Sequence, residues 1–551
     1  MTGAGVQDDT SDLLAIRDLK VAGMIAGEMR PLVKGVDLTV KRGEVLGLIG
    51  ESGAGKSTIG LAAMGYSRPG CRIVGGQVLF RGTDLLRLTE QEKKDVWGVR
   101  VAYVAQSATA AFNPMRRIID QCIEVPVQHG LMDQASARRE LVGIFSHLRL
   151  PEPTQIGARY PHQLSGGQLQ RAMTAMATCA HPDLVIFDEP TTALDVTTQI
   201  EVLAAIKRLV REVQVAAIYI SHDLAIVAQM ADRIVVLRHG RVVEEASTQE
   251  MMTNPREDYT KSLWAVRSLF KEEDLAAPLL LQLDNVSAQY GHHKVLHDIS
   301  LTVPKGRTVA IVGESGSGKS TLARVVVGLL PPTQGRIRLA GSDLPPALKD
   351  RSRSLLRRIQ IIHQASDAAL NPRRRVGDIL SRALGHKKGL PRSQRRQRVR
   401  ELLRMVELDD AVATAFPRQL SGGQKQRVCI ARALAAEPEL IICDEVTSAL
   451  DQLVAGEILK LLIDLQRRAL CSYLVITHDL SIVRAIADQV VVLQNGRIVE
   501  SGPKSQVLDA PQHDYTKLLL ASVPRMAVGW LDKVLSDRAG IAAARDRTAE
   551  V

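Results

Sequence analysis

Short apolar runs, each bounded by glycine or an acidic residue, recur along the chain. Runs of four to eight apolar residues are typical of strands that are buried on both faces of a sheet. Stretches with helical spacing lie between them. This alternation predicts an α/β fold with a largely parallel sheet. The clearest runs are EVLGLIG and TVAIVG before two glycine-rich segments, LVIF and LIIC before two acidic pairs, and AAIYIS and YLVIT before two histidines.

The same order of motifs occurs twice, which indicates two copies of one domain. Lys56 and Lys319 of the glycine-rich segments are 263 positions apart, whereas the later motifs are all 256 apart, as Glu189 and Glu445 are. A constant offset across several motifs excludes chance matches. The repeated segments are GESGAGKST and GESGSGKST (50–58 and 313–321), LSGGQ (164–168 and 420–424), LVIFDE and LIICDE (184–189 and 440–445), and ISHDL and ITHDL, which contain His222 and His478.

The repeats divide the chain into two domains and three connecting or terminal segments. The segment KEEDLAAP between the copies is short and charged and ends in proline, which is typical of a linker. In the last segment, Trp530, Leu531, Val534 and Leu535 have helical spacing and predict a docked terminal helix or a frayed end. The predicted boundaries are a flexible N-terminus (1–12), the first domain (13–267), the linker (268–278), the second domain (279–525) and a tail (526–551).

Composition supports a globular protein. Of the 551 residues, 45% are hydrophobic and 24% charged, which excludes disorder as the main state. No apolar run reaches the roughly 18 residues that a transmembrane helix needs. The N-terminus has neither the basic start nor the apolar stretch of a signal peptide, so we expect a cytoplasmic location.

The net charge and the cysteines say little about the binding partners of this protein. A formal net charge of +11 fits nucleic acid, an anionic membrane surface, a phosphate ligand or no specific partner. The six cysteines form no CxxC pair and lie mostly in apolar segments. Buried free thiols are therefore favoured over a metal cluster or a disulfide framework.

Two segments match the phosphate-binding pattern G-x-x-x-x-G-K-[ST], and each follows a predicted strand and opens a predicted helix. Glycines let the backbone wrap closely around phosphates, the helix start adds partial positive charge, and the lysine adds a full charge. The serine hydroxyl is suited to Mg²⁺. The candidate ATP-binding residues are Gly50, Ser52, Gly53, Gly55, Lys56, Ser57 and Thr58 in the first copy and Gly313, Ser315, Gly316, Gly318, Lys319, Ser320 and Thr321 in the second.

An acidic pair ends a predicted strand in each copy: Asp188 with Glu189, and Asp444 with Glu445. The aspartate can hold Mg²⁺ through its water shell. The glutamate can orient or deprotonate an attacking water. Because both pairs follow their glycine loop at a similar distance, they predict two hydrolytic sites.

The SGGQ segments resemble the signature of ATP-binding-cassette (ABC) ATPases. Together with the other repeated motifs, the resemblance to this family covers nearly the whole chain. It implies two tandem P-loop nucleotide-binding domains, each with a RecA-like core, an antiparallel β subdomain and a helical subdomain. Further residues look like the family's Q-loop glutamine, which also contributes to the Mg²⁺ site, its D-loop aspartate and its switch histidine. The residues concerned are Ser165, Gly166, Gly167, Gln168, Ser421, Gly422, Gly423 and Gln424 in the signatures, Gln106 and Gln364, Asp195 and Asp451, and His222 and His478.

The resemblance also implies an intramolecular dimer with ATP and Mg²⁺ as cofactors. Each ATP would lie between the glycine loop of one copy and the signature and D-loop of the other. Both glutamates and both histidines are present, so both sites are expected to hydrolyse ATP. One departure concerns the adenine: the second copy has Tyr290 where family members stack the base, and alignment places Gly23 there in the first copy. A glycine cannot supply a stacking surface. The equivalence of the two sites is therefore open.

An Asn-Pro pair follows each Q-loop glutamine, at Asn113 and Asn371, and each copy ends in a similar DYTK segment. These features look like the peptide/nickel class of bacterial ABC importers. The class implies two transmembrane permease subunits, an extracytoplasmic solute-binding protein and a peripheral position on the cytoplasmic face of the inner membrane. The sequence thus predicts an importer ATPase for di- or oligopeptides, with a nickel or metallophore importer as the alternative. The solute itself is not encoded in this chain.

A soluble tandem cassette acting on ribosomes or DNA is the alternative from another class. Translation-type cassettes resemble chains with a long charged helical linker, which KEEDLAAP is too short to form. Repair-type cassettes carry zinc-binding cysteines that this sequence lacks. We therefore expect no nucleic-acid partner.

Overall fold

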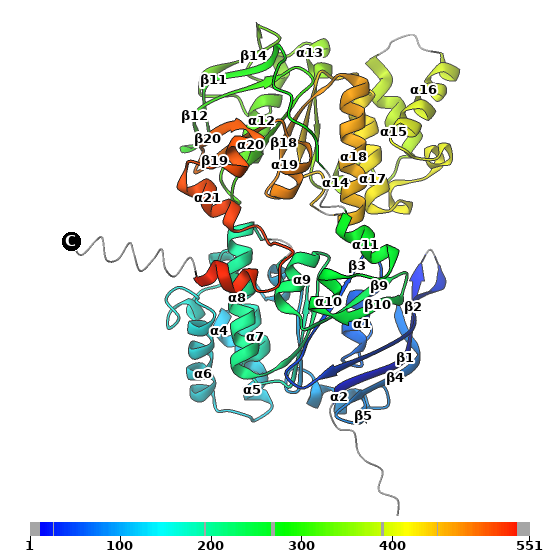
Figure 1. The fold of residues 1–551 in the computed structure, drawn as a ribbon, viewed down its shortest axis with the longest axis vertical. Helices are drawn as coiled ribbons and strands as arrows, with labels where there is room; N and C mark the ends of the chain where they lie inside the picture. Colours follow the sequence, from blue (N-terminus) through cyan, green and yellow to red (C-terminus); the bar gives the residue numbers. More distant parts are fainter. Residues whose placement is uncertain are drawn as a thin grey trace, which may run out of the picture. The chain divides into compact units, whose positions relative to one another are not determined.

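The computed structural model describes residues 12–25, 27–191, 194–265, 270–386, 391–448 and 450–536. It groups the chain into two compact units (Figure 1). Unit 1 comprises Met1–Leu263 together with Pro524–Val551, and unit 2 comprises Trp264–Val523. The N-terminus that we expect to be flexible lies outside the described residues up to position 11, as does the tail beyond 536.

Unit 1 is built on a six-stranded sheet in the order β10-β9-β3-β8-β7-β6. All neighbours are parallel except β10, which pairs antiparallel with β9 at the edge. Every residue of β3, β7 and β8 is buried, which explains their continuous apolar sequences. The predicted α/β fold is therefore confirmed.

A second, antiparallel sheet of unit 1 has the order β2-β1-β4-β5. Side chains from β1, β2 and β4 and from the central strands form one hydrophobic core. Helices α4 to α7 contact one another and make a helical part of the unit.

The strands of unit 1 are β1 (Asp12–Ile25), β2 (Glu28–Lys41), β3 (Val45–Gly50), β4 (Cys71–Phe80), β5 (Thr83–Asp84), β6 (Val101–Val104), β7 (Leu184–Asp188), β8 (Ala216–Ile220), β9 (Arg233–Arg238) and β10 (Arg241–Ser247). The helices of this half are α1 (Lys56–Ala62), α2 (Glu90–Val96), α3 (Ala108–Ala111), α4 (Ile118–Cys122), α5 (Glu124–Gln128), α6 (Gln134–His147), α7 (Gly166–Thr178), α8 (Val196–Val213), α9 (Leu224–Met230), α10 (Thr248–Thr253) and α11 (Asp258–Ala265).

Unit 2 repeats this architecture. Its six-stranded sheet has the order β16-β17-β18-β13-β19-β20, and its antiparallel sheet the order β12-β11-β14-β15. The strands are β11 (Leu279–Tyr290), β12 (His293–Pro304), β13 (Thr308–Val312), β14 (Gln334–Leu339), β15 (Ser342–Asp343), β16 (Ile359–Ile362), β17 (Leu440–Asp444), β18 (Ser472–Ile476), β19 (Gln489–Gln494) and β20 (Arg497–Pro503). The helices are α12 (Lys319–Val327), α13 (Arg353–Arg358), α14 (Ser366–Ala369), α15 (Val376–Ala383), α16 (Arg392–Met405), α17 (Gly422–Leu434), α18 (Gln452–Ala469), α19 (Leu480–Ile486), α20 (Lys504–Asp509) and α21 (Asp514–Ala521).

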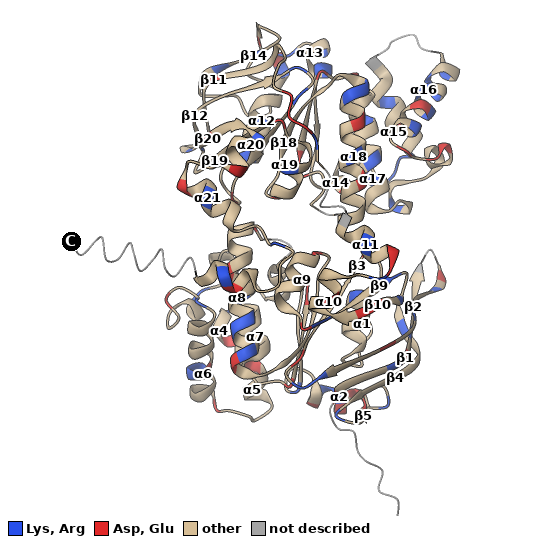
Figure 2. Cartoon of the chain, in the orientation of Figure 1, with Lys and Arg blue, Asp and Glu red and all other residues tan. Residues whose placement is uncertain are grey.

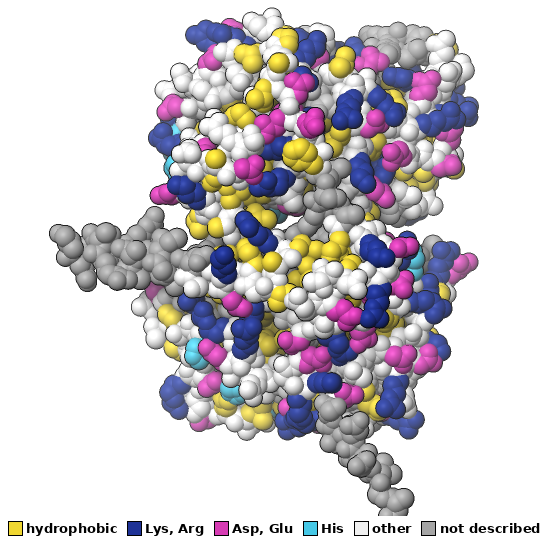
Figure 3. All heavy atoms as spheres, in the orientation of Figure 1, with side chains coloured by type: hydrophobic (Ala, Val, Ile, Leu, Met, Phe, Trp, Pro, Cys, Tyr) yellow, Lys and Arg dark blue, Asp and Glu magenta, His cyan; other side chains and the backbone are white. Residues whose placement is uncertain are grey.

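Basic and acidic residues alternate along both units (Figure 2), and side chains of both signs intermix on the molecular face that Figure 3 shows. The positive net charge is thus spread over this face. Among the helices of the described ranges, none combines the length and the apolar character that crossing a bilayer requires.

Candidate functional site

The first glycine loop connects the end of β3 to the start of α1. Gly50, Gly53 and Gly55 have φ angles of 147°, 82° and 100°, which L side chains rarely adopt. A Cβ atom on Gly50 would lie 2.1 Å from the carbonyl oxygen of Leu237, so no other residue fits there. Lys56 is buried, and its Nζ donates to the carbonyl oxygens of Gly50 (2.7 Å) and Glu51 (2.9 Å). The loop therefore curls around the ammonium group, with Ser52 and Gly53 inside the loop and Thr58 in the first turn of α1.

The second glycine loop has the same geometry between β13 and α12. Lys319 Nζ donates to the carbonyl oxygens of Gly313 (2.8 Å) and Glu314 (2.7 Å). Neither Gly55 nor Gly318 can cap its helix with a side chain. The cap position therefore offers no side-chain oxygen that would compete with a phosphate for the helix start. Gly316 and Ser315 lie within this loop, and Ser320 and Thr321 follow in the first turn of α12.

Two of the three residues predicted for Mg²⁺ in the first copy, Ser57 and Asp188, contact each other in unit 1, whereas Gln106 contacts Glu189. Ser57 Oγ donates to Oδ1 of Asp188 across 2.8 Å, which joins the start of α1 to the end of β7. Hydroxyl and carboxylate oxygens are the ligands that Mg²⁺ prefers. Asp188 is also contacted by two residues that sequence reasoning missed: Tyr103 OH donates to Oδ2 across 2.5 Å, and Arg68 lies 3.7 Å away. The only sequence signal for Tyr103 is a polar group in an otherwise apolar strand.

The corresponding pair in unit 2 is looser. Ser320 Oγ lies 3.4 Å from Oδ1 of Asp444. Burial, and secondly the neighbouring Glu445, raise the pKa of Asp444. The strand pairing identifies the counterpart of Tyr103: Tyr103 pairs with Ile186, and Ile361 pairs with Ile442, which lies 256 positions after Ile186. The second site therefore has an isoleucine where the first has the tyrosine hydroxyl.

Glutamate, histidine and glutamine converge in both units. In unit 1, Oε1 of Glu189 lies 3.2 Å from Nδ1 of His222, and Gln106 Nε2 donates to Oε2 across 3.1 Å. Burial disfavours the charged imidazole, but the hydrogen bond and the charge of Glu189 outweigh it and raise the pKa of His222. Glu189 has a φ of 49°, in the left-handed region that a non-glycine residue seldom adopts. Strain of this kind clusters at functional sites.

Unit 2 has the same constellation. Oε1 of Glu445 lies 3.2 Å from Nδ1 of His478, and Gln364 Nε2 donates to Oε2 across 2.6 Å. The hydrogen bond from His478 lowers the pKa of Glu445, and the same bond raises the pKa of His478. Glu445 also has a φ of 49°. Both glutamates are thus held as hydrogen-bond acceptors.

The signature and D-loop residues act locally as helix caps. Ser165 accepts from the backbone N–H of Gln168 at the start of α7, and the Gln168 side chain accepts from the N–H of Ser165. Asp195 accepts from the N–H of Thr198 at the start of α8. A Cβ on Gly167 would lie 2.2 Å from Cγ2 of Thr198, so α7 and α8 approach closely there. Gly166 opens α7, and in unit 2 Ser421, Gly422, Gly423, Gln424 and Asp451 occupy the same positions at the starts of α17 and α18.

The structure supports the alignment of Gly23 with Tyr290. Gly23 pairs with Arg30, and Tyr290 pairs with His293, which lies 263 positions after Arg30, the offset of the glycine loops. A Cβ on Gly23 would lie 2.6 Å from Cδ1 of Leu32, so a side chain there would displace the end of the Leu32 side chain. The Tyr290 side chain is exposed, and its OH accepts from Nη1 of Arg324 across 3.0 Å.

Comparison with known proteins agrees with this geometry. The family model described as ABC transporter matches residues 33–192 and 296–448. The model described as oligopeptide/dipeptide transporter, C-terminal region, matches residues 499–549. The chain is 36% identical over 533 residues to the peptidoglycan transport ATP-binding protein YejF of Agrobacterium fabrum, an alignment that covers 94% of this chain and 97% of the relative. It is also 36% identical over 564 residues to the glutathione import ATP-binding protein GsiA of Salmonella choleraesuis, covering 94% of this chain and 90% of the relative.

Proposed function

The chain belongs to the ABC transporter family, and from that membership we propose that it is the ATP-hydrolysing, energy-coupling subunit of an importer for short peptides. The observation that carries the proposal is the pairing of two complete sets of hydrolytic residues with a match to the oligopeptide/dipeptide transporter C-terminal region. Proteins of this family bind ATP with Mg²⁺, and this chain has the residues for both at each site.

Each cassette assigns distinct tasks to its residues. The ammonium groups of Lys56 and Lys319 neutralise the outer phosphates. Ser57 with Asp188, and Ser320 with Asp444, supply hard oxygen ligands, so the residues present fit Mg²⁺. When bound, Mg²⁺-ATP supplies the phosphoanhydride bond whose hydrolysis releases free energy.

The glutamates act on water. Glu189 and Glu445 accept a proton from the attacking water, because each directly follows the aspartate that contacts the serine of its glycine loop. His222 and His478 hold the carboxylates through the 3.2 Å contacts. Gln106 and Gln364 donate to the second oxygen of each carboxylate.

Each ATP is shared by two half-sites. One site combines the phosphate-binding and hydrolytic residues of the first cassette with the signature and D-loop residues of the second. The first set is Lys56, Ser57, Gln106, Asp188, Glu189 and His222, and the second set is Ser421, Gly422, Gly423, Gln424 and Asp451. The other site combines the corresponding residues of the second cassette with the signature and D-loop residues of the first. The first set is Lys319, Ser320, Gln364, Asp444, Glu445 and His478, and the second set is Ser165, Gly166, Gly167, Gln168 and Asp195. In each signature the serine and the glutamine cap each other, so we assign the N–H groups of the glycines between them to the phosphate.

The solute is a short peptide or a peptide-containing compound. The printed names of the two relatives refer to glutathione import and peptidoglycan transport, and both compounds contain peptide bonds. Two permease subunits and a solute-binding protein complete the importer, with this chain peripheral on the cytoplasmic face of the inner membrane. Import of nickel or a metallophore is the second candidate, which the peptide/nickel class itself favours. The intermixed charges in Figures 2 and 3 give little support to a nucleic-acid partner.

Uptake in cells that lack this chain tests the proposal, with labelled short peptide and labelled nickel compared side by side. Complementation uses the wild type, the Lys56→Ala, Lys319→Ala double variant, and a control with the exposed lysines changed, Lys94→Ala with Lys460→Ala. We expect peptide uptake with the wild type and the control, and its loss with the double variant. Uptake of nickel alone would assign the chain to metal import, and recovery of neither solute would overturn the importer proposal for both.

A further inference from the structure

The last described segment of the chain packs into unit 1, although residues 264–523 before it form unit 2. We call residues 525–535 the C-terminal strap. Trp530, Leu531 and Val534 of the strap are buried. An exposed tail would leave these side chains in water, so their burial favours the docked position.

One glutamine of unit 1 recognises the backbone of the strap. Gln229, in α9, is only 3% exposed. Its Nε2 donates to the carbonyl oxygens of Arg525 (3.0 Å) and Ala527 (2.9 Å), and its Oε1 accepts from the N–H of Leu531 (3.1 Å). Both N–H groups and the oxygen of this buried amide are therefore satisfied by the strap.

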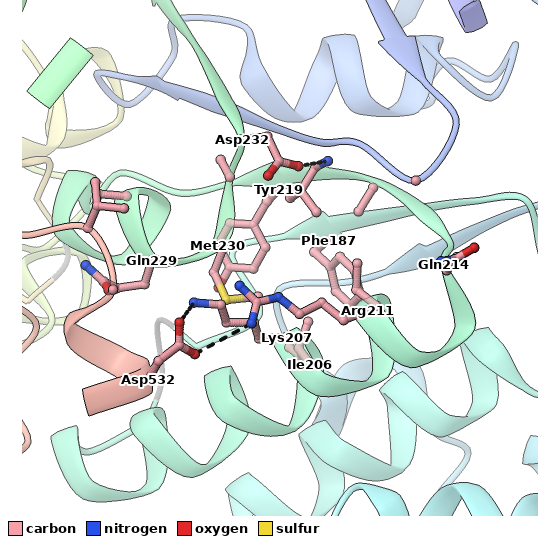
Figure 4. A pocket seen from close by; sticks show the side chains of 18 of the residues that line it. Phe187, Ile206, Lys207, Arg211, Gln214, Tyr219, Gln229, Met230, Asp232 and Asp532 are labelled. Carbon is pink, nitrogen blue, oxygen red and sulfur yellow. Dashed lines mark hydrogen bonds and ion pairs between the residues drawn. The ribbon is translucent and has the colours of Figure 1, made fainter. Parts of the chain in front are cut away.

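Ion pairs also link the strap to α8. Asp532 of the strap lies 3.0 Å from Nζ of Lys207 and 3.8 Å from Nη1 of Arg211, both on α8 (Figure 4). Val528, Gly529 and Asp532 form one wall of a cavity of about 550 Å³, and residues of α8 and α9 form another. We call Lys207, Arg211 and Gln229 the strap groove.

Unit 2 carries a segment at the corresponding place. Asp488, which lies 256 positions after Asp232, accepts from Nζ of Lys271 (2.6 Å) and from the N–H of Asp274 (3.2 Å). Lys271 also donates to Gln466 of α18 across 2.8 Å. Lys271 and Asp274 lie in the segment that follows the first cassette in the sequence, just as the strap follows the second cassette. Since α11 and α21 are 256 positions apart, residues 271–274 correspond to residues 527–530 of the strap. The segment after each cassette is therefore docked in the unit that contains the other cassette.

The two grooves are not interchangeable. Ala485 stands in unit 2 where unit 1 has Gln229, and Ile463 stands where unit 1 has Lys207. Conversely, the strap has Ala527 where the linker has Lys271. Two of the three side chains of the strap groove are thus replaced by apolar residues in unit 2, whereas Arg211 has a counterpart in Arg467.

We propose that these grooves are reciprocal docking sites, and that the C-terminal strap ties the second cassette to the first in the absence of nucleotide. The linker would give one tie and the strap a second. Two ties raise the effective concentration of one half-site near the other, so ATP would not have to bring the cassettes together from free solution.

The test isolates the strap from the linker. A protease recognition sequence is inserted between residues 267 and 268, the purified full chain is cleaved, and the fragments are analysed by gel filtration without nucleotide. We expect them to elute together. The Gln229→Ala, Lys207→Ile variant should weaken their association at least about tenfold, which would amount to about 1.4 kcal/mol. Both changes introduce the residue that unit 2 has at the matching position, so we expect the fold to tolerate them.

Two further variants make the outcome decisive. Removal of residues 524–551 should separate the fragments, whereas the Glu212→Ala, Lys533→Ala control, at exposed positions of α8 and the strap, should leave them together. Binding of a fluorescent ATP analogue to each uncleaved variant checks that the cassettes are folded. Separation of the wild-type fragments, or joint elution after removal of the strap, would overturn the proposal. The readout needs no transport, so either outcome leaves the proposed import function to its own test.

Discussion

The hydroxyl of Tyr103 donates a 2.5 Å hydrogen bond to Oδ2 of Asp188, and Ile361 stands at the matching position of the second cassette. The buried carboxylate that we propose for Mg²⁺ in the first site therefore has a tyrosine donor, where the second site has an isoleucine beside Asp444. The two sites share the glutamate, histidine and glutamine contacts but differ in how this carboxylate is held.

Tyr103→Phe should destabilise the first cassette. The change keeps the ring and removes the donor, which leaves a carboxylate that is only 3% exposed with one hydrogen bond fewer. We expect a loss of about 1–3 kcal/mol in the free energy of unfolding, measured by urea denaturation. Tyr66→Phe, at a more exposed tyrosine, is the matched control. Equal stability of Tyr103→Phe and wild type would show that the hydrogen bond contributes little.

The contact between His478 and Glu445 should stabilise the second cassette most between about pH 4.5 and 6.5. The pKa of His478 is raised from 6.5, so its contribution is complete below 6.5 and is lost as the pH rises through the folded value. The pKa of Glu445 is lowered from 4.5, so its contribution is present above 4.5 and is lost as the pH falls through the folded value. The destabilisation by His478→Ala should thus be larger near pH 5.5 than near pH 8.5, as measured by thermal unfolding. An equal effect at both values, or a similar profile for the exposed His292→Ala control, would contradict the assignment.

Glu189→Gln and Glu445→Gln should lower ATP hydrolysis to a similar extent. Both glutamates have the same φ, and each contacts the histidine and accepts a hydrogen bond from the glutamine of its own unit. Removing a general base costs about 10²–10⁴-fold at the affected site, so the double variant should be nearly inactive. Steady-state phosphate release measures this, with the exposed Glu212→Gln as control. A gross difference between the two single variants would mean that one site is mainly regulatory.

Tyr290→Ala should weaken nucleotide binding by the second cassette. Loss of one aromatic stacking surface for a base costs about 1–3 kcal/mol, or roughly five- to a hundredfold in affinity. Titration with a fluorescent ATP analogue measures the change, and Tyr290→Phe, which keeps the ring, should bind nearly as wild type. Gly23→Ala should not improve binding, because a methyl group supplies no aromatic surface for the base. Unchanged affinity of Tyr290→Ala would show that the adenine is held elsewhere.

The sequence by itself determined the fold class, the duplication and most of the candidate site. Glycine loops, helix caps and buried strands are local features, because each depends on backbone conformation or apolar character within a few residues. Gly50 shows this: its φ of 147° and the nearby Leu237 carbonyl admit only glycine, so the motif can be recognised from its letters.

Only the tertiary structure decided which distant residues meet. Tyr103 reaches Asp188 across 85 positions because β6 pairs with β7, and the same letters in another strand order would place it elsewhere. Gln229 binds Leu531 across 302 positions, and neither residue carries a motif. An amide that recognises backbone groups leaves no pattern in the sequence it binds, since every residue offers the same N–H and C=O groups. The helical spacing of Trp530, Leu531 and Val534 predicted a docked helix or a frayed end, but only the folded chain shows that the strap packs into unit 1.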